Sequence, residues 1–256
     1  MSAYRDQHFL TDTLAVEKIA GVLELSGRQV LEIGPGRGVL TRALLNKGAR
    51  VIAIELDLTL VSFLQTEFAK AIRQGTLTLI SGDATRVAIP PFEFVVANLP
   101  YSASSKITFR LLDIGFESAV LMYQKEFADR MLADIGTRDC GRLSVMVQTF
   151  ARASRCFDLP PGAFSPPPAV HSTVVRIEPR PPLFPIEDRA IYDELVRVLY
   201  AGRRKTVRSI LKNAKSIFGE DLIVSLIDDL DPAILTSRPE ELYLEDYATI
   251  ANRLVC

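Results

Sequence analysis

The tetrapeptide Asn98-Leu99-Pro100-Tyr101 combines residue types that suit chemistry on an aromatic amine. The exocyclic amine of adenine is a poor nucleophile because its lone pair is delocalised into the ring. Acceptors for its N–H hydrogens localise that lone pair, and the Asn98 side-chain carbonyl with the backbone carbonyl of Leu99 or Pro100 could supply them. Proline fixes the backbone beside the acceptor, and the Tyr101 ring offers a face on which a base can stack. The alternative is a strand that ends at a proline and is followed by a core tyrosine.

Three more segments whose residues could bind a ligand follow short apolar runs. The stretch Glu32-Ile33-Gly34-Pro35-Gly36-Arg37-Gly38 has G-x-G-x-G spacing, which frees backbone N–H groups for a polar ligand. Glu55 lies 21 residues after Gly34, where a carboxylate could accept hydrogen bonds from both hydroxyls of a ribose. Asp83, within Ser81–Ala84, could hold a purine amine. Alone, each also has a structural explanation: a tight turn, a helix-capping carboxylate or a common loop.

An alternating pattern of strands and helices would position these residues. Such alternation predicts a doubly wound, largely parallel α/β sheet, the class to which Rossmann-like folds belong. Ligands of such sheets bind beyond the carboxyl ends of the strands, where the residues above fall. We predict strands at 29–33, 50–56, 76–80, 92–97, 119–123, 143–149 and 172–177, and helices from about 12 to 23 and at 39–46, 58–72, 105–112 and 127–133.

Length and composition limit the class of protein. The chain has 256 residues, of which 48% are apolar and 24% charged, as in a globular protein of one or two domains. No apolar run reaches the roughly 18 residues of a membrane span, and nothing near the N-terminus resembles a signal peptide, so we expect a cytoplasmic protein without a membrane partner. Three dispersed cysteines and two histidines predict neither a disulfide nor a metal site.

A proline-rich stretch, Arg180-Pro181-Pro182-Leu183-Phe184-Pro185, separates this pattern from a C-terminal part that is helical throughout. We therefore predict one domain over residues 1–180 and a small all-helical domain over 181–256. From Arg197 to Lys215 the chain has seven basic residues and no acidic ones, although the net charge is only −1. Such a segment can bind phosphates, or it can be an ordinary solvated helix face.

These motifs together resemble the class I S-adenosylmethionine-dependent methyltransferases and, more closely, the ribosomal RNA adenine-N6,N6 dimethyltransferase family. The resemblance covers nearly the entire chain. It is strengthened by Gln124-Lys125-Glu126, by Phe164-x-Pro166-x-Pro168-x-Val170-x-Ser172 and by Arg203-Arg204-Lys205-Thr206. The sequence departs from the family at Ala169, where many members carry lysine, and this change alters a possible contact to the RNA backbone.

The resemblance implies a role for each motif and gives domain 1–180 the catalytic function and domain 181–256 an RNA-binding function. S-adenosylmethionine would be the methyl donor, and small-subunit ribosomal RNA or the pre-ribosomal small subunit the partner during ribosome biogenesis. We expect dimethylation at N6 of adenines, two adjacent ones in all, by a monomer. The implied catalytic residues are Asn98, Leu99, Pro100, Tyr101 and Phe164, of which Phe164 would line the target-base pocket. The implied cofactor-binding residues are Gln7, His8, Leu10, Gly34, Gly36, Glu55, Asp83, Ala84 and Asn98. The implied RNA-binding residues are Arg203, Arg204, Lys205, Arg208 and Lys212.

Three other functions remain open at this point. Large-subunit ribosomal RNA adenine methyltransferases that confer antibiotic resistance share the cofactor loop and a similar Asn-x-Pro-Tyr motif, but the Arg-Arg-Lys-Thr segment and the helical C-terminal part favour the small subunit. A non-catalytic RNA-binding assembly factor is disfavoured by the intact Asn98, Tyr101 and Glu55. A nicotinamide dehydrogenase is disfavoured by the glycine spacing.

Overall fold

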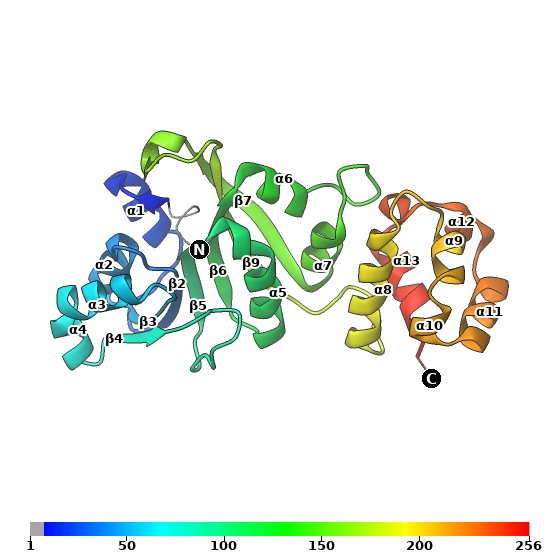
Figure 1. Cartoon of the computed structure of the whole chain (residues 1–256), viewed down its shortest axis with the longest axis horizontal. Helices are drawn as coiled ribbons and strands as arrows, with labels where there is room; N and C mark the ends of the chain where they lie inside the picture. The colour runs from blue at the N-terminus through cyan, green and yellow to red at the C-terminus, as the bar shows by residue number, and fades with distance from the viewer. Residues whose placement is uncertain (1–7, 256) are drawn as a thin grey trace. The chain divides into compact units, whose positions relative to one another are not determined.

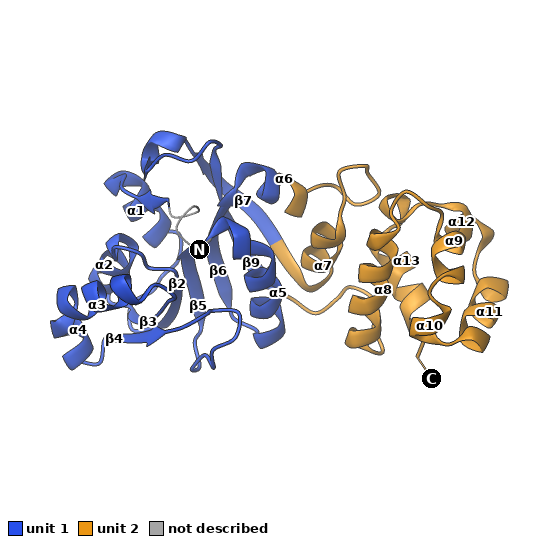
Figure 2. Ribbon diagram, viewed as in Figure 1, with its two compact units in different colours: residues 1–128, 153–179 blue, residues 129–152, 180–256 orange. Residues whose placement is uncertain are grey.

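The computed structural model describes residues 8–255, which form two compact units (Figure 2). The first unit comprises the described residues up to 128 together with 153–179, and the second comprises 129–152 together with those from 180 onward. The predicted domain boundary near residue 180 coincides with one junction between the units. Residues 129–152, which fall within the predicted first domain, belong to the second unit.

The first unit contains a seven-stranded sheet with the order β4-β3-β2-β5-β6-β9-β7 and a two-stranded sheet of β1 and β8 (Figure 1). Neighbouring strands from β4 to β6 run parallel, and β9 is antiparallel to β6, with Ala119 opposite Ile177. The largely parallel α/β sheet expected from the sequence is confirmed. The strands are β1 Phe9–Leu10, β2 Gln29–Ile33, β3 Arg50–Glu55, β4 Leu77–Ser81, β5 Phe94–Asn98, β6 Ser118–Gln124, β7 Ala151–Leu159, β8 Phe164–Ser165 and β9 Ser172–Pro179.

Burial on both faces explains the apolar runs of the central strands. Val30 and Leu31 of β2 and Val95 and Val96 of β5 have no exposed surface. Strands of a parallel sheet that is covered on both faces carry continuous apolar runs rather than an alternating pattern. Polar residues follow these apolar runs at Glu32, near the end of β2, and at Asn98, the last residue of β5.

Side-chain caps fix where several helices begin. Asp12 accepts hydrogen bonds from the backbone N–H groups of Leu14 and Ala15, and Asp57 caps the helix after β3 in the same way. The helices that begin in this unit are α1 Thr13–Ala20, α2 Val39–Asn46, α3 Leu58–Glu67, α4 Ala69–Arg73, α5 Ser104–Ile114 and α6 Lys125–Met131, with single 3-10 turns at Tyr101–Ala103 and Pro161–Ala163.

The prediction of a strand at 143–149 is wrong, because these residues form helix α7, Arg142–Phe150. Seven of its residues are buried, on nearly all sides, so the helical period of apolar and polar positions is absent. A short apolar run of this kind cannot be assigned to helix or strand from periodicity alone. The strand in this region is β7, which the sequence analysis missed. It lies at the end of the sheet and is mostly exposed, so it lacks an apolar run.

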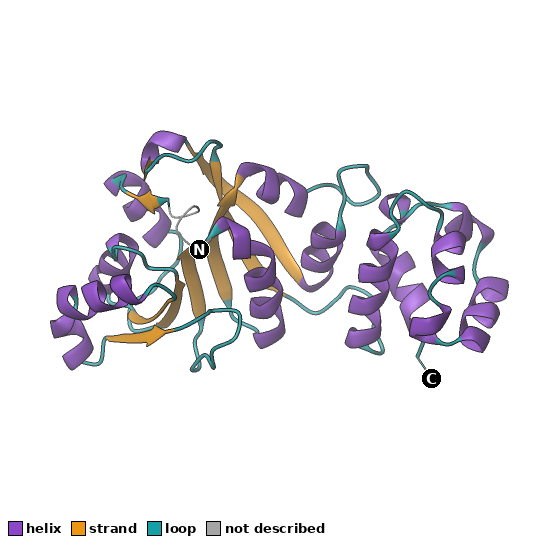
Figure 3. Ribbon diagram, viewed as in Figure 1, coloured by secondary structure: helices purple, strands orange, loops and turns teal. Residues whose placement is uncertain are grey.

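The second unit is helical apart from the start of β7 (Figure 3). Helix α8 packs against α7 and α13 and buries Tyr192, Leu195 and Leu199 completely. No described helix combines the length and apolar character needed to cross a bilayer. Besides α7, the helices are α8 Arg189–Ala201, α9 Val207–Lys212, α10 Lys215–Phe218, α11 Glu220–Asp229, α12 Pro232–Thr236 and α13 Leu244–Asn252, with a 3-10 turn at Pro239–Glu241.

Candidate active site

A cavity of about 510 Å³ lies in the first unit, beyond the carboxyl ends of β2, β3, β4 and β5. The structure brings most of the predicted cofactor and catalytic residues to this one cavity. They are His8, Leu10, Gly34, Gly36, Glu55, Asp83, Ala84, Asn98, Leu99, Pro100 and Tyr101. Phe164 is not among the lining residues, and Gln7 lies outside the residues that the structure describes.

The glycine loop between β2 and α2 needs glycine at its centre. Gly36 has a φ of +59°, and a Cβ atom there would lie 2.9 Å from the ring of Phe9. A side chain would therefore be both strained and obstructed. The N–H of Gly36 donates to Oε2 of Glu55 over 3.1 Å, so the loop and the acidic residue are held together. The N–H groups of Gly34 and Gly38 donate to the backbone oxygens of Ile54 and Pro35, so the expectation that these glycines leave free donors for a ligand is wrong.

Glu55 at the end of β3 is held by backbone groups on both carboxylate oxygens. Oε1 accepts from the N–H groups of Leu56 at 2.8 Å and Asp57 at 3.0 Å, and Oε2 accepts from Gly36. Each oxygen of an ionised carboxylate can accept about two hydrogen bonds, so acceptor capacity remains on Oε2. The carboxylate is only 6% exposed and lines the cavity. It is therefore oriented before any hydroxyl group arrives.

Asp83 follows β4 and is oriented by its neighbour Thr85. Its Oδ1 accepts from both the N–H and the hydroxyl of Thr85, each at 2.8 Å. These two hydrogen bonds lower the pKa of Asp83, and the nearby Arg86 and Lys106 add to the effect. Asp83 thus lines the cavity as an ionised acceptor.

Asn98 ends β5, and a backbone carbonyl sets the orientation of its amide. Nδ2 donates to the backbone oxygen of His8 over 3.1 Å. Because a carbonyl can only accept, this contact requires the amide nitrogen on the side of His8 and leaves Oδ1 as the acceptor on the other side. The sequence offered no sign of this contact, because the two residues are 90 positions apart.

Tyr101 and Phe164 differ in how far they reach the cavity. The Tyr101 hydroxyl shares a 2.7 Å hydrogen bond with Ser172, and burial raises the pKa of Tyr101 above its usual value while that hydrogen bond opposes the rise. Phe164 is 4% exposed and packs in the hydrophobic core that includes Leu10 and Val16. Its role in a target-base pocket stays a prediction, since its ring serves the core in this structure.

Residues 8–10 contact parts of the site that are distant in sequence. Phe9 and Leu10 pair with Ser165 and Phe164 as β1 and β8. The His8 Nδ1 lies 2.8 Å from the carbonyl oxygen of Pro166, so Nδ1 must carry the hydrogen. The His8 ring lies 5.6 Å from that of Tyr101, at an angle of 32°. His8, predicted to bind the cofactor, therefore also contacts residues assigned to the target base.

Glu32, which the sequence analysis named as the first residue of the glycine stretch without giving it a role of its own, also lines the cavity. It lies within β2 immediately before the glycine loop and is 1% exposed. Burial raises the pKa of Glu32 to about 8, and the negative charge of Glu55 adds to the rise. An acidic residue beside the apolar run Val30–Leu31 was the available signal for this burial. Across residues 8–255, no three His, Cys, Asp or Glu side chains are grouped in a way that could hold a metal ion.

The cavity, with its glycine loop, ribose-type carboxylate and Asn-x-Pro-Tyr motif, agrees with comparisons to known proteins. A family profile for ribosomal RNA adenine dimethylase matches residues 3–245. The chain belongs to the ribosomal RNA adenine dimethylase family. This membership confirms the expected enzyme class, an S-adenosylmethionine-dependent methyltransferase.

Individual members of the family show how far the similarity extends. The chain is 68% identical to a probable ribosomal RNA small subunit methyltransferase A of Methanospirillum hungatei, over 99% of both chains. A protein of the same description from Halobacterium salinarum is 44% identical over 96% of this chain and 88% of its own. Among solved structures, a dimethyladenosine transferase from Plasmodium falciparum superposes with a TM-score of 0.76 at 28% identity, over 95% of this chain and 96% of its own. The 23S rRNA methyltransferase ErmE has a TM-score of 0.66 at 25% identity, over 96% of this chain and 99% of its own.

The predicted RNA-binding residues lie in the second unit of this dimethylase family member. Arg204, Lys205, Arg208 and Lys212 are exposed. Arg203 is exposed as well, but it has an ion-pair partner, because its Nε lies 3.0 Å from Oε2 of Glu240. Two more cations of the basic segment are paired with carboxylates, Arg197 with Glu194 and Lys215 with Glu220. Acidic residues outside the segment therefore pair with three of its cations, and only the partner of Arg203 is distant in sequence.

Proposed function

We propose that this chain transfers methyl groups from S-adenosylmethionine to N6 of adenines in small-subunit ribosomal RNA and produces N6,N6-dimethyladenosine. The observation that carries the proposal is the orientation of Asn98. Its amide nitrogen is bonded to His8, so its oxygen is available as an acceptor in the cavity that also contains Glu55 and Gly36. Family membership supports the same reaction.

The cavity residues fit the methyl donor. Glu55 would accept from the ribose hydroxyls, Asp83 would accept from the adenine amine, and Gly34 and Gly36, which line the same cavity, would lie beside the methionine end. When bound, S-adenosylmethionine supplies an activated methyl group on a positively charged sulfonium. The buried Glu32 carboxyl lines the same cavity, and its ionisation would be favoured by a cation there.

The target adenine would have to leave its stack to reach this cavity. Oδ1 of Asn98 and the backbone carbonyl after it would accept the N6 hydrogens and localise the lone pair on nitrogen. The Tyr101 ring, held by Ser172, would stack against the base. A neutral acceptor is sufficient, because the methylated nitrogen can release its proton after the transfer. Catalysis would then come mainly from positioning, an effect worth up to roughly 7–11 kcal/mol in favourable cases.

A second transfer requires space for a monomethylated amine. Leu99, an aliphatic residue, lines the cavity beside Asn98. Its side chain is smaller than an aromatic ring, which is compatible with a larger substrate. We propose that both transfers use this one site.

The helical unit would bind the RNA through phosphates. Arg204, Lys205, Arg208 and Lys212 are exposed and positively charged. Such contacts give salt-sensitive binding that is largely independent of sequence. This proposal gives the methyltransferase role to one predicted domain and the RNA-binding role to the other. It also includes a monomeric state and a cytoplasmic location.

The likeness to ErmE keeps large-subunit RNA as a second candidate substrate. Both candidates are tested by incubating the full chain with labelled S-adenosylmethionine and with unmethylated RNA of either subunit, followed by nucleoside analysis. We expect label in N6,N6-dimethyladenosine from small-subunit RNA. Label only in large-subunit RNA would support the second candidate. An absence of label in both, with the methyl donor bound, would support a non-catalytic assembly factor.

A further inference from the structure

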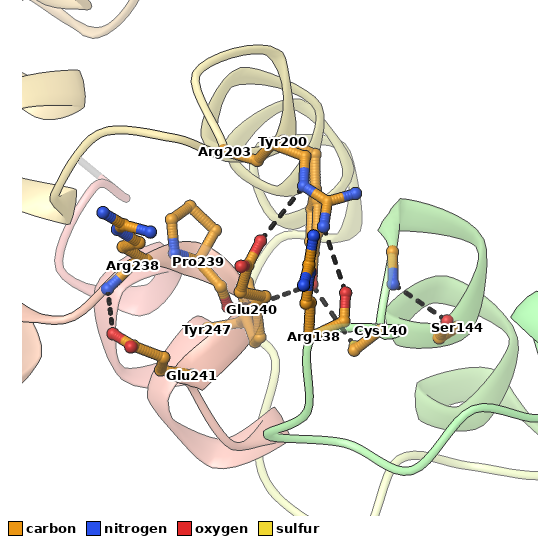
Figure 4. Close-up of polar contacts among 11 residues, drawn as sticks. Arg138, Cys140, Ser144, Tyr200, Arg203, Arg238, Pro239, Glu240, Glu241 and Tyr247 are labelled. Atoms are coloured by element: carbon orange, nitrogen blue, oxygen red, sulfur yellow. Dashed lines mark hydrogen bonds and ion pairs between the residues drawn. The ribbon is translucent and has the colours of Figure 1, made fainter.

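The loop of residues 132–141, between α6 and α7, is held to the C-terminal helices at two places within the second unit (Figure 4). At the surface, Arg203 donates from Nε to Glu240 and from Nη2 to the backbone oxygen of Arg138, each over 3.0 Å. Glu240 is 15% exposed and Arg203 is 46% exposed. Arg203 therefore bridges the loop and the 3-10 turn at Pro239–Glu241.

The second attachment is a chain of buried hydrogen bonds whose direction is determined. The Tyr247 hydroxyl donates to the Pro239 carbonyl, which can only accept. The Tyr200 hydroxyl must then donate to Tyr247, over 3.0 Å, and the Cys140 thiol must donate to Tyr200, over 3.3 Å. Burial raises the pKa of Cys140, which keeps the thiol protonated as this order requires. The loop thus meets α8, α13 and the 3-10 turn in one fixed arrangement.

Arg203 has a different environment from the basic residues that follow it. Two of its N–H groups are used within the protein, and the Glu240 carboxylate offsets its charge. Arg204 and Lys205 are exposed next to it, and Arg138 is exposed on the loop. Since one arginine side chain connects residue 203 to the backbone of residue 138, these exposed cations belong to the same part of the surface.

We propose that Arg203 supports RNA binding as a positioning residue that holds loop 132–141, and that Arg138 on this loop contacts an RNA phosphate. The proposal rests on the proposed function, because it assumes that the helical unit binds ribosomal RNA. Arg203 then does not contact RNA directly, whereas Arg138 does. The sequence analysis did not predict an RNA contact in loop 132–141.

Conservative substitutions separate the two roles of an arginine. Lysine retains a charge for a phosphate, but its ammonium lacks the planar pair of parallel N–H donors that reaches Glu240 and Arg138 together. The test is the Kd of the full chain for unmethylated small-subunit RNA, transcribed in vitro, measured at several salt concentrations. Arg204→Gln should lower the salt slope by about one, whereas Arg204→Lys should retain it. Arg138→Gln should also lower the slope by about one.

Arg203→Lys should weaken binding about as much as Arg138→Gln, roughly tenfold, the effect of one charge-assisted hydrogen bond. The double variant should bind no more weakly than Arg138→Gln alone, because Arg203 acts through the loop. If Arg203→Lys binds like the wild type while Arg203→Gln loses one unit of slope, Arg203 is a direct contact and the proposal is wrong. A wild-type slope for Arg138→Gln would also overturn it.

Amide hydrogen exchange provides a readout without RNA. In Arg203→Lys, the amides of residues 134–141 should exchange faster, while the buried strands β2 and β5 remain protected. Unchanged exchange in the loop would contradict the positioning role. Failure of the proposed function would look different: the wild type would then neither bind small-subunit RNA nor methylate it, whereas failure of this inference leaves both properties intact and removes only the effects of Arg138 and Arg203.

Discussion

The cofactor cavity of the first unit and the basic segment of the second unit hold their polar groups in opposite ways. In the cavity, Glu55 and Asn98 are bonded to backbone N–H and carbonyl groups that the fold fixes. In the basic segment, Arg204 and Lys205 project from an exposed turn. The first arrangement suits a small molecule whose atoms must be placed within fractions of an ångström. The second suits a polyanion, whose attraction depends on charge more than on position.

This contrast predicts different responses to substitution. Removing a buried, oriented group leaves its partners unsatisfied and changes one chemical step strongly. Removing one exposed charge lowers affinity modestly and in proportion to the number of phosphates contacted. Four experiments, from the largest expected effect to the smallest, test whether the contrast holds.

The largest effect should come from Glu32 and concerns the pH dependence of stability. The pKa of Glu32 is raised from 4.5 to about 8 by burial, so the folded chain holds a proton between these values that the unfolded chain has released. Its free energy of unfolding therefore falls as the pH rises through this window, by at most about 5 kcal/mol. Glu32→Gln should remove this fall, and the difference should grow from pH 5 to pH 8 in denaturant titrations of the cofactor-free chain.

Glu17→Gln is the matched control, because Glu17 is an exposed carboxylate of α1 in the same unit. Because this variant keeps the Glu32 carboxyl, it should keep the fall in the free energy of unfolding between pH 5 and pH 8. If Glu32→Gln also follows the wild-type curve, the Glu32 carboxyl is ionised in the folded chain and the cavity is more polar than its burial indicates.

Asn98→Ala should have the next largest effect, on the chemical step. Loss of the oriented acceptor should lower kcat for methyl transfer by a factor of roughly 10²–10³ or more, as for other preorganised polar groups at reacting atoms. Binding of S-adenosylmethionine, measured by calorimetry, should persist. Asn98→Asp keeps an acceptor oxygen but loses the donor to His8, so it tests whether orientation matters separately. Full activity in Asn98→Ala would refute the catalytic role.

Glu55→Ala should affect the methyl donor and leave RNA binding unchanged. Hydrogen bonds to a charged group contribute roughly 1.5–3 kcal/mol, which corresponds to a 10- to 100-fold higher Kd for S-adenosylmethionine. The Kd for small-subunit RNA should stay the same. Asp57→Ala is the control, because Asp57 caps α3 through Thr59 and should alter stability more than affinity. If both variants lose the same affinity for S-adenosylmethionine, the assignment of the ribose contact to Glu55 is wrong.

The framework of the fold was predictable because its strands are short apolar runs followed by glycine or polar residues. Strands β2 to β6 and their parallel orientation follow from that pattern. Helix α7 was not predictable, because a buried apolar run such as Leu143–Phe150 has no period that separates helix from strand. The edge strand β7 was missed for the opposite reason, since its exposed positions leave no apolar signal.

The candidate site was predictable one segment at a time, and its connections were not. The glycine loop, Glu55 and Asn98 are motifs within single stretches of chain, so their types and spacing are visible in the sequence. The contacts of His8 with Asn98, Tyr101 and Pro166 join segments at least 90 residues apart and depend on the complete fold. For the same reason, the ion pair of Arg203 with Glu240 could not be inferred from a segment that contains no acidic residue.

The smallest effect should come from a comparison of two arginines of the basic segment. It tests whether exposed cations without a carboxylate partner are the ones that bind RNA. Arg208 on α9 is exposed, whereas Arg197 on α8 makes two hydrogen bonds to Glu194, at 2.5 and 2.7 Å, which raise its pKa. Arg208→Gln should lower the salt slope of RNA binding by about one and weaken affinity several-fold at fixed salt. Arg197→Gln should change neither, because Glu194 already offsets its charge. Equal effects would mean that net charge alone governs binding, and that the pairing seen in the folded unit does not select which cations contact phosphate.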